Sequence, residues 1–175
     1  METPIQEKSE RNRILENWIE AYSDQILRVC FLYLSDTALA EDALQDTWIK
    51  AWKALTRQSA LPEHEKTWLM RIAINTCKDY TRTAWFRHVD RRTAADELPE
   101  SLLCTVQPDH SLSMAVMELP GKYKQVILLY YYQGLTMDET GNALGLSRSC
   151  VYRRLKKAEE LLRKAWIGGD DRENT

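Results

Sequence analysis

The chain has 175 residues and a formal net charge of −2, a length typical of one domain or of two small ones. Hydrophobic residues make up 44% of it and charged residues 29%, a balance that excludes general disorder. No apolar run approaches the length of a membrane span, and the N-terminus lacks the apolar core of a signal peptide, so we expect a cytoplasmic protein.

The first half of the chain is predicted to contain three helices. Apolar residues at steps of three and four predict the first from Ile14 to Cys30, with a break near Ser23-Asp24, and the second from Leu44 to Leu55. After a loop at 58–65, a third helix is expected at about 65–84. These helices form a predicted first domain, residues 10–87.

The periodicity fails between residues 88 and 108, where prolines and acidic residues predict a flexible linker. A second domain is predicted at residues 109–167. Pro120 and Gly134 bracket the run VILLYYY in the way that start and stop signals bracket a helix, so a helix is favoured there over a strand.

A helix-turn-helix is the sharpest local signal. Thr136 and Glu139 have the spacing of a capping box, which predicts a helix from Met137 to about Leu144. Gly145 suits the left-handed turn, and Ser147 can cap a second helix. Gly141 is expected to face inward, where it would let the two helices approach closely.

The second of these helices is the expected reader of the DNA major groove. Its buried stripe is predicted to be Val151, Leu155, Ala158, Leu162 and Ala165. The candidate DNA-contacting residues lie at its start, on its opposite face or beside it: Ser147, Arg148, Ser149, Tyr152, Arg153, Arg154, Lys156 and Lys157. A two-helix hairpin with a solvated basic exterior is the alternative.

Two basic segments interrupt an otherwise acidic chain, which suggests two contacts with a polyanion. Residues 66–92 carry seven bases against two acids, and residues 148–164 again carry seven against two. In the first segment one exposed helical stripe is expected, consisting of Arg71, Asn75, Lys78 and Arg82. The alternative is the ordinary water-facing side of an amphipathic helix.

The sequence contains no metal or catalytic constellation. His64, His88 and His110 lie 24 and 22 residues apart, outside known ligand spacings, and the four cysteines form no CxxC pair. Nucleotide-binding loops and nucleophile motifs are also absent. We therefore expect no metal, no cofactor and no enzymatic activity.

Taken together, residues 38–55, 67–82, 119–136 and the helix-turn-helix through Leu162 resemble the extracytoplasmic function (ECF) class of the sigma-70 family. The resemblance implies an all-α protein with two small helical domains, sigma region 2 and sigma region 4, joined by a flexible linker. It implies an alternative sigma factor that binds core RNA polymerase and recognises the minus-10 and minus-35 promoter elements. Glu139-Thr140-Gly141 departs from the usual family pattern, so the first helix of the helix-turn-helix is expected to pack unusually.

The resemblance also implies roles for particular residues. The stripe of Arg71, Asn75, Lys78 and Arg82 would bind the minus-10 element, and the eight candidate DNA-contacting residues would bind the minus-35 element. The clamp coiled coil of the largest polymerase subunit would be bound by Asp42, Leu44, Gln45, Asp46, Trp48, Ile49 and Trp52. Helical spacing places Asp42, Gln45, Asp46 and Ile49 on one face, whereas Trp48 and Trp52 can equally be core residues.

An anti-sigma factor, often membrane-bound, is the regulator that the resemblance implies. Two other readings stay open at this point: a stand-alone helix-turn-helix transcription regulator acting as a dimer, and a helical adaptor that does not contact DNA. Capture of core polymerase by the purified protein would distinguish a sigma factor from the dimeric regulator.

Overall fold

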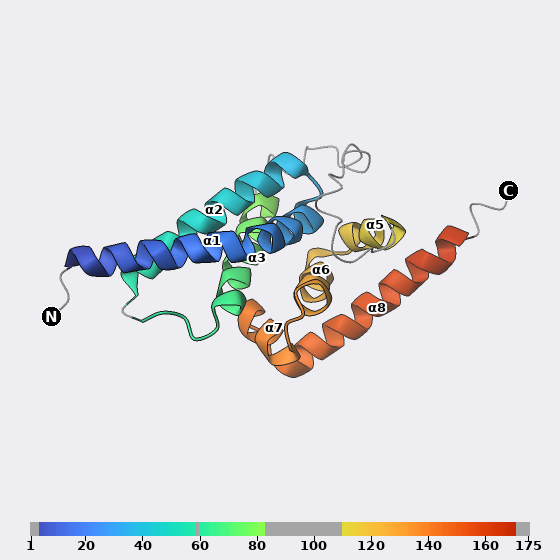
Figure 1. Cartoon of the computed structure of the whole chain (residues 1–175). Coiled ribbons are helices and arrows are strands. Elements are labelled where there is room, and N and C mark those ends of the chain that lie inside the picture. Colours follow the sequence, from blue (N-terminus) through green and yellow to red (C-terminus); the bar gives the residue numbers. More distant parts are fainter. Residues whose placement is uncertain (1–3, 59, 83–109, 171–175) are drawn as a thin grey trace.

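The computed structural model describes residues 4–58, 60–82 and 110–170, and the regular structure in these ranges is entirely helical (Figure 1). This confirms the all-α prediction. The predicted linker, residues 88–108, lies outside the described residues. No helix in the described ranges is both long enough and apolar enough to cross a membrane.

Three helices form the first unit: α1 (Pro4–Leu34), α2 (Thr37–Arg57) and α3 (Glu65–Arg82). The break expected near Ser23-Asp24 is wrong, because α1 runs through it. Buried residues on both sides of that point, Trp18 and Ile26, give α1 one continuous packing stripe, which outweighs the weak local preference of serine and aspartate for helix ends.

A tight turn joins α1 to α2. Ser35 adopts a positive φ of 58°, and the side chain of Asp36 accepts a hydrogen bond of 2.8 Å from the backbone N–H of Leu39. This cap satisfies one of the free amides at the start of α2. The turn folds α2 back along α1, and α3 packs against both helices, with Leu55, Leu69 and Ile74 fully buried.

The second unit consists of α5 (His110–Glu118), α6 (Gly121–Ile127), the π-helix η3 (Leu128–Tyr132), α7 (Met137–Leu144) and α8 (Arg148–Asp170). The helix predicted between Pro120 and Gly134 is confirmed, but its last part is π-helical. The Gln133 N–H accordingly bonds to the carbonyl of Leu128, at 3.0 Å. Gly134, with φ of 65°, then ends the helix.

The two units pack directly against each other. Helix α1 contacts α5, α6 and η3, while α3 contacts α7. Figure 1 shows α7 beside one end of α3, with α8 running away from that point. The buried side chains of both units therefore belong to one continuous apolar core.

Candidate nucleic-acid interface

The helix-turn-helix forms through the local signals that the sequence carries. The Thr136 hydroxyl accepts from the Glu139 N–H at 3.2 Å, and the Glu139 carboxylate accepts from the Thr136 N–H at 2.8 Å. The Thr136 hydroxyl also donates to this carboxylate, at 2.8 Å, and the bonds from the Thr136 N–H and hydroxyl lower the pKa of Glu139 because they favour its ionised form. Gly145 is left-handed with φ of 67°, and the Ser147 hydroxyl caps α8 by accepting from the Cys150 N–H at 3.3 Å.

Gly141 sets how closely the two helices approach. It is buried, as expected, and a Cβ placed there would lie 2.6 Å from the carbonyl oxygen of Leu146. Its neighbour Thr140 is also fully buried. The unusual Glu139-Thr140-Gly141 sequence is thus accommodated by close backbone contact at the turn.

The outer face of α8 is open to solvent. Ser149, Tyr152, Arg153 and Lys156 are all exposed, and they lie opposite the buried Val151, Leu155 and Ala158. The predicted buried stripe is wrong at Ala165, which is exposed, and Leu162 is only half-buried. Both residues lie on the last part of α8, which extends past the helices that cover its first half (Figure 1).

Several bases on α8 are held by acidic neighbours. Arg148 pairs with Asp138 at 2.8 Å across the turn. Lys156 pairs with Glu159 at 2.9 Å, and Glu159 also accepts a hydrogen bond of 2.7 Å from the Tyr131 hydroxyl. These exposed pairs are weak and can be exchanged for phosphate contacts. Arg153 is exposed on the same side of the helix.

The predicted stripe lies on one side of α3, but it is not exposed to solvent along its whole length. Arg71, Asn75 and Arg82 are exposed, whereas Lys78 is half-buried. Arg71 donates a hydrogen bond to the backbone carbonyl of Asn142 in α7. Burial, followed by the nearby charges of Arg154 and Arg82, lowers the pKa of Lys78. The structure therefore brings the two basic segments next to each other.

The acidic face of α2 is partly engaged with α3. Asp42, Gln45 and Ile49 are exposed, and Ile49 exposes 49% of its surface. Asp46 is half-buried and accepts a hydrogen bond of 3.0 Å from the Tyr80 hydroxyl. Burial, together with this contact, raises the pKa of Tyr80 to about 12.

The apolar members of the same predicted set, Leu44, Trp48 and Trp52, are half-buried. They pack on the core but leave part of their surface exposed. Trp48 and Trp52 are therefore placed to act as core residues or to contact polymerase, the two roles considered above. Nearby, Lys50 pairs with Asp79 at 2.9 Å, an exposed contact between α2 and α3. This ion pair had no signal in the sequence, because the two residues belong to different helices.

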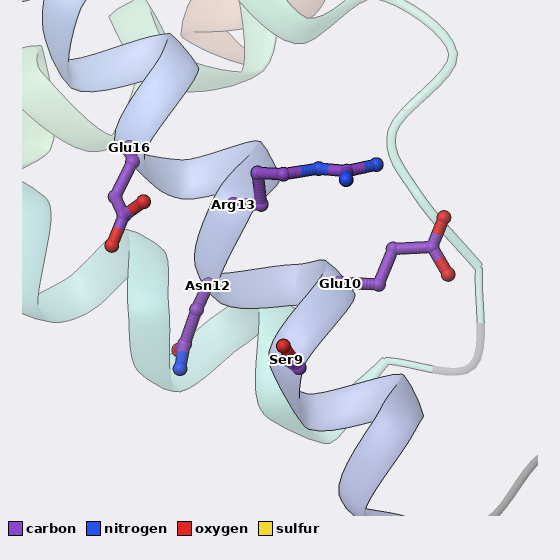
Figure 2. Close-up of a pocket in the computed structure, with 5 residues that line it drawn as sticks. All are labelled: Ser9, Glu10, Asn12, Arg13 and Glu16. Carbon is purple, nitrogen blue, oxygen red and sulfur yellow. The ribbon is translucent and has the colours of Figure 1, made fainter.

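A hollow of about 620 Å³ lies beside the N-terminal part of α1. Its lining residues are Ser9, Glu10, Asn12, Arg13 and Glu16, and Figure 2 shows that their side chains leave the helix on different sides. They do not converge on a point where a ligand could bind. Within the described ranges, no group of three or more His, Cys, Asp or Glu side chains could hold a metal ion.

Two parts of the chain match known families. Residues 18–87 match sigma-70 region 2, and residues 115–164 match sigma-70 region 4. The ECF RNA polymerase sigma factor SigW of Bacillus subtilis is 28% identical over 160 residues, which cover 83% of this chain and 85% of that protein. SigM of the same organism is 27% identical over 158 residues, covering 86% and 93%.

Solved structures share the fold. CnrH, in complex with the cytosolic domain of CnrY, superposes with a TM-score of 0.68 at 24% identity and covers 95% of both chains. The sigma factor RpoE, in complex with the anti-sigma factor NepR from Bartonella quintana, gives a TM-score of 0.63 at 17% identity, covering 87% of this chain and 96% of that one.

Two helical units, one of them with a solvent-facing helix-turn-helix, define a transcription factor of the sigma type. The chain belongs to the sigma-70 family of RNA polymerase sigma factors, in its extracytoplasmic function class. Its function is that of an alternative sigma factor.

Proposed function

We propose that the chain binds core RNA polymerase and directs it to promoters by contacting the minus-10 element with the first unit and the minus-35 element with the second. The boundaries proposed for these activities are residues 10–87 and 109–167, with residues 88–108 as the connection. The protein acts in the cytoplasm and has no catalytic activity of its own.

The observation that carries this proposal is the solvent-facing surface of α8. Tyr152, Arg153 and Lys156 project from one side of a helix whose other side is buried, which is the arrangement a major-groove reader needs. The bases Arg71 and Arg82 on α3 supply the second contact, and the exposed Ile49 beside Asp42 supplies an apolar and acidic surface for polymerase.

An anti-sigma factor is a further proposed partner. Support comes from the solved structure of RpoE, which is a complex with the anti-sigma factor NepR.

Transcription in vitro tests the proposal. Purified core polymerase is incubated with the chain and a library of genomic fragments, and the 5′ ends of the transcripts are sequenced. We expect initiation at a small set of sites that share two motifs at a fixed spacing. No transcripts above those of core polymerase alone, together with no capture of polymerase by the chain, would overturn the proposal.

A further inference from the structure

Helix α1 holds both ends of the segment that leads from α2 into α3. Arg11 of α1 donates hydrogen bonds to the backbone carbonyls of Leu55 and Gln58, the latter at 2.7 Å, where α2 ends. Tyr22 of α1 donates to the carboxylate of Glu65, the first residue of α3, at 2.6 Å. Figure 1 shows the segment running from the end of α2, beside the first turns of α1, to the start of α3.

Each contact suits the helix end on which it lies. The last carbonyls of a helix have no partner within it and carry partial negative charge, so the guanidinium of Arg11 is favourable at the end of α2. A carboxylate is favourable at the start of a helix for the opposite reason, and Glu65 occupies that place in α3. The hydrogen bond to Glu65, followed by burial, raises the pKa of Tyr22 to about 12, so its hydroxyl remains a donor at neutral pH.

An aromatic contact supports the same end of α3. The ring centroids of Trp18 in α1 and Trp68 in α3 lie 5.9 Å apart, and Trp18 is buried. Arg11, Trp18 and Tyr22 follow one another at steps of seven and four, which places them on one face of α1. From Arg11 to Tyr22 the helix rises by about 16 Å. One continuous helix therefore sets the positions of both ends of the segment.

The residues between these ends are open to solvent. Residues 60–64 form no helix or strand, and Leu61 exposes 49% of its surface. Ala60, Glu63 and His64 are exposed as well. Exposed residues outside regular structure have little packing to hold them in place, so the position of this segment depends on how its ends are held.

The segment ends in line with the basic stripe of α3. The Trp68 N–H donates to the carbonyl of His64, at 3.0 Å, so the first turn of the helix starts from His64. His64 precedes Arg71 by seven residues, or about two turns, and therefore lies on the side of α3 that carries the stripe. The segment thus extends the proposed minus-10 surface. Bases stack on exposed ring and apolar side chains beside cationic residues, which this surface offers.

We propose that Arg11 and Tyr22 are positioning residues for promoter recognition, because they fix residues 60–64 beside the stripe of α3 and so determine how sharply the minus-10 element is distinguished from other sequences. The inference rests on the proposed function, in which the first unit contacts that element. A loop that is already held in its binding position loses less conformational entropy on binding, so affinity and discrimination both depend on these two contacts. Arg11 and Tyr22 act through the segment and do not themselves touch DNA.

Single substitutions test the two contacts separately. Arg11→Met removes the hydrogen-bond donors and keeps an unbranched side chain, while Tyr22→Phe removes only the hydroxyl. Arg11→Lys keeps a cation that can donate, and it should restore part of what Arg11→Met loses. Arg13→Met is the matched control, because it removes the same charge from an exposed arginine two positions further along α1.

A spin label on the segment measures its mobility in the free, full-length protein. The label is attached at Ala60→Cys, an exposed position, with Cys104 and Cys150 replaced by serine. Cys30 and Cys77 stay in place, because both are fully buried and therefore unreactive.

We expect a broad spectrum, typical of a restrained label, in the parent and in Arg13→Met. Arg11→Met and Tyr22→Phe should each give narrower lines, which report faster motion, and Arg11→Lys should give an intermediate spectrum. Circular dichroism should show the same helix content in all of them.

Transcription by the holoenzyme measures the consequence for recognition. Each variant is assayed on promoters randomised across the minus-10 element and, separately, across the minus-35 element. We expect Arg11→Met and Tyr22→Phe to prefer the best minus-10 sequences several-fold less strongly than the parent, with polymerase capture and the minus-35 preference unchanged. A general loss of stability would lower polymerase capture and both preferences together.

Spectra of Arg11→Met and Tyr22→Phe identical to that of the parent would overturn the inference. So would a mobile segment combined with an undiminished minus-10 preference. A parent protein that neither captures polymerase nor starts transcription contradicts the proposed function instead, and the spin-label spectra still test whether α1 holds the segment.

Discussion

Gly141 is the residue at which the helix-turn-helix tolerates no side chain. Alanine is the better helix former by about 1 kcal/mol, but its Cβ would meet the backbone of Leu146. A backbone atom cannot rotate out of the way as a side chain can. The steric cost of the added Cβ should therefore exceed the gain in helix propensity.

We expect Gly141→Ala to lower the free energy of unfolding by about 1 to 3 kcal/mol. Urea denaturation followed by circular dichroism measures this. Asn142→Ala, on the exposed neighbouring position, keeps the backbone carbonyl that Arg71 contacts and should leave stability nearly unchanged. A Gly141→Ala protein as stable as the parent would contradict the close contact at the turn.

Arg153 is the best single probe of promoter reading, because it is exposed in the middle of the outer face of α8. Arg153→Ala should weaken binding of the holoenzyme to a minus-35 site by about 1 to 3 kcal/mol and reduce its preference for that sequence. Competition between matched and scrambled duplexes measures both effects. Arg163→Ala is the control, because it removes the same charge near the end of α8. An equal loss of sequence preference in that variant would contradict the assignment of Arg153 to promoter reading.

At the scale of elements, α7 depends on its capping box and therefore on pH. The folded protein lowers the pKa of Glu139 below its ordinary value of 4.5, so this carboxylate contributes stability above that pH. The contribution disappears as the pH falls through the lower pKa of the folded state.

Thr136→Ala removes the two hydrogen bonds of the Thr136 hydroxyl, one accepted from the Glu139 N–H and one donated to the Glu139 carboxylate, and should cost about 1 kcal/mol at neutral pH. The difference in melting temperature from the parent should narrow as the pH is lowered from 6 to 3. Thr56→Ala is the control, because its hydroxyl bonds only to carbonyls of its own helix and no titrating group is involved. A difference that stays constant with pH would contradict the role of the Glu139 carboxylate.

The exposed surface of α2 is the proposed site of polymerase binding. Asp46 is a poor probe of it, since the hydrogen bond from Tyr80 gives this carboxylate a structural role as well. Ile49 exposes 49% of its surface, so Ile49→Asp should leave stability unchanged and weaken capture of core polymerase at least tenfold, as the loss of about 1.4 kcal/mol would. Ile19→Asp, on α1 and 37% exposed, should bind polymerase normally, and a loss equal to that of Ile49→Asp would contradict the assignment.

For the whole molecule, docking predicts that the two units unfold together. A shared interface couples their stabilities, so calorimetry should show one transition for the parent. In Lys66→Met, which loses the hydrogen bond from α3 to the carbonyl of Gln133, we expect two transitions or one clearly broadened transition. Two separate transitions already present in the parent would show that the interface contributes little.

Most of the helical elements could be predicted from sequence because their signals are local. Capping residues, a left-handed glycine and apolar spacing act within one or two turns of chain, and they placed α7, the turn and α8 correctly. Such signals fail where packing outweighs them. Helix α1 continues through Ser23 because its neighbours on both sides are buried, and the helix after Pro120 widens into a π-helix at Leu128 to Tyr132.

The sequence predicted each part of the candidate site as one face of a single helix. The site residues that are exposed lie on these predicted faces. The sequence does not show how these faces are arranged relative to one another in space. Lys124 bonds to a carbonyl 91 positions away in the chain, and Lys66 to one 67 positions away. Every residue has a carbonyl, so an acceptor of this kind has no sequence signature, and only the tertiary structure could decide that the two units dock and which lysines hold them together.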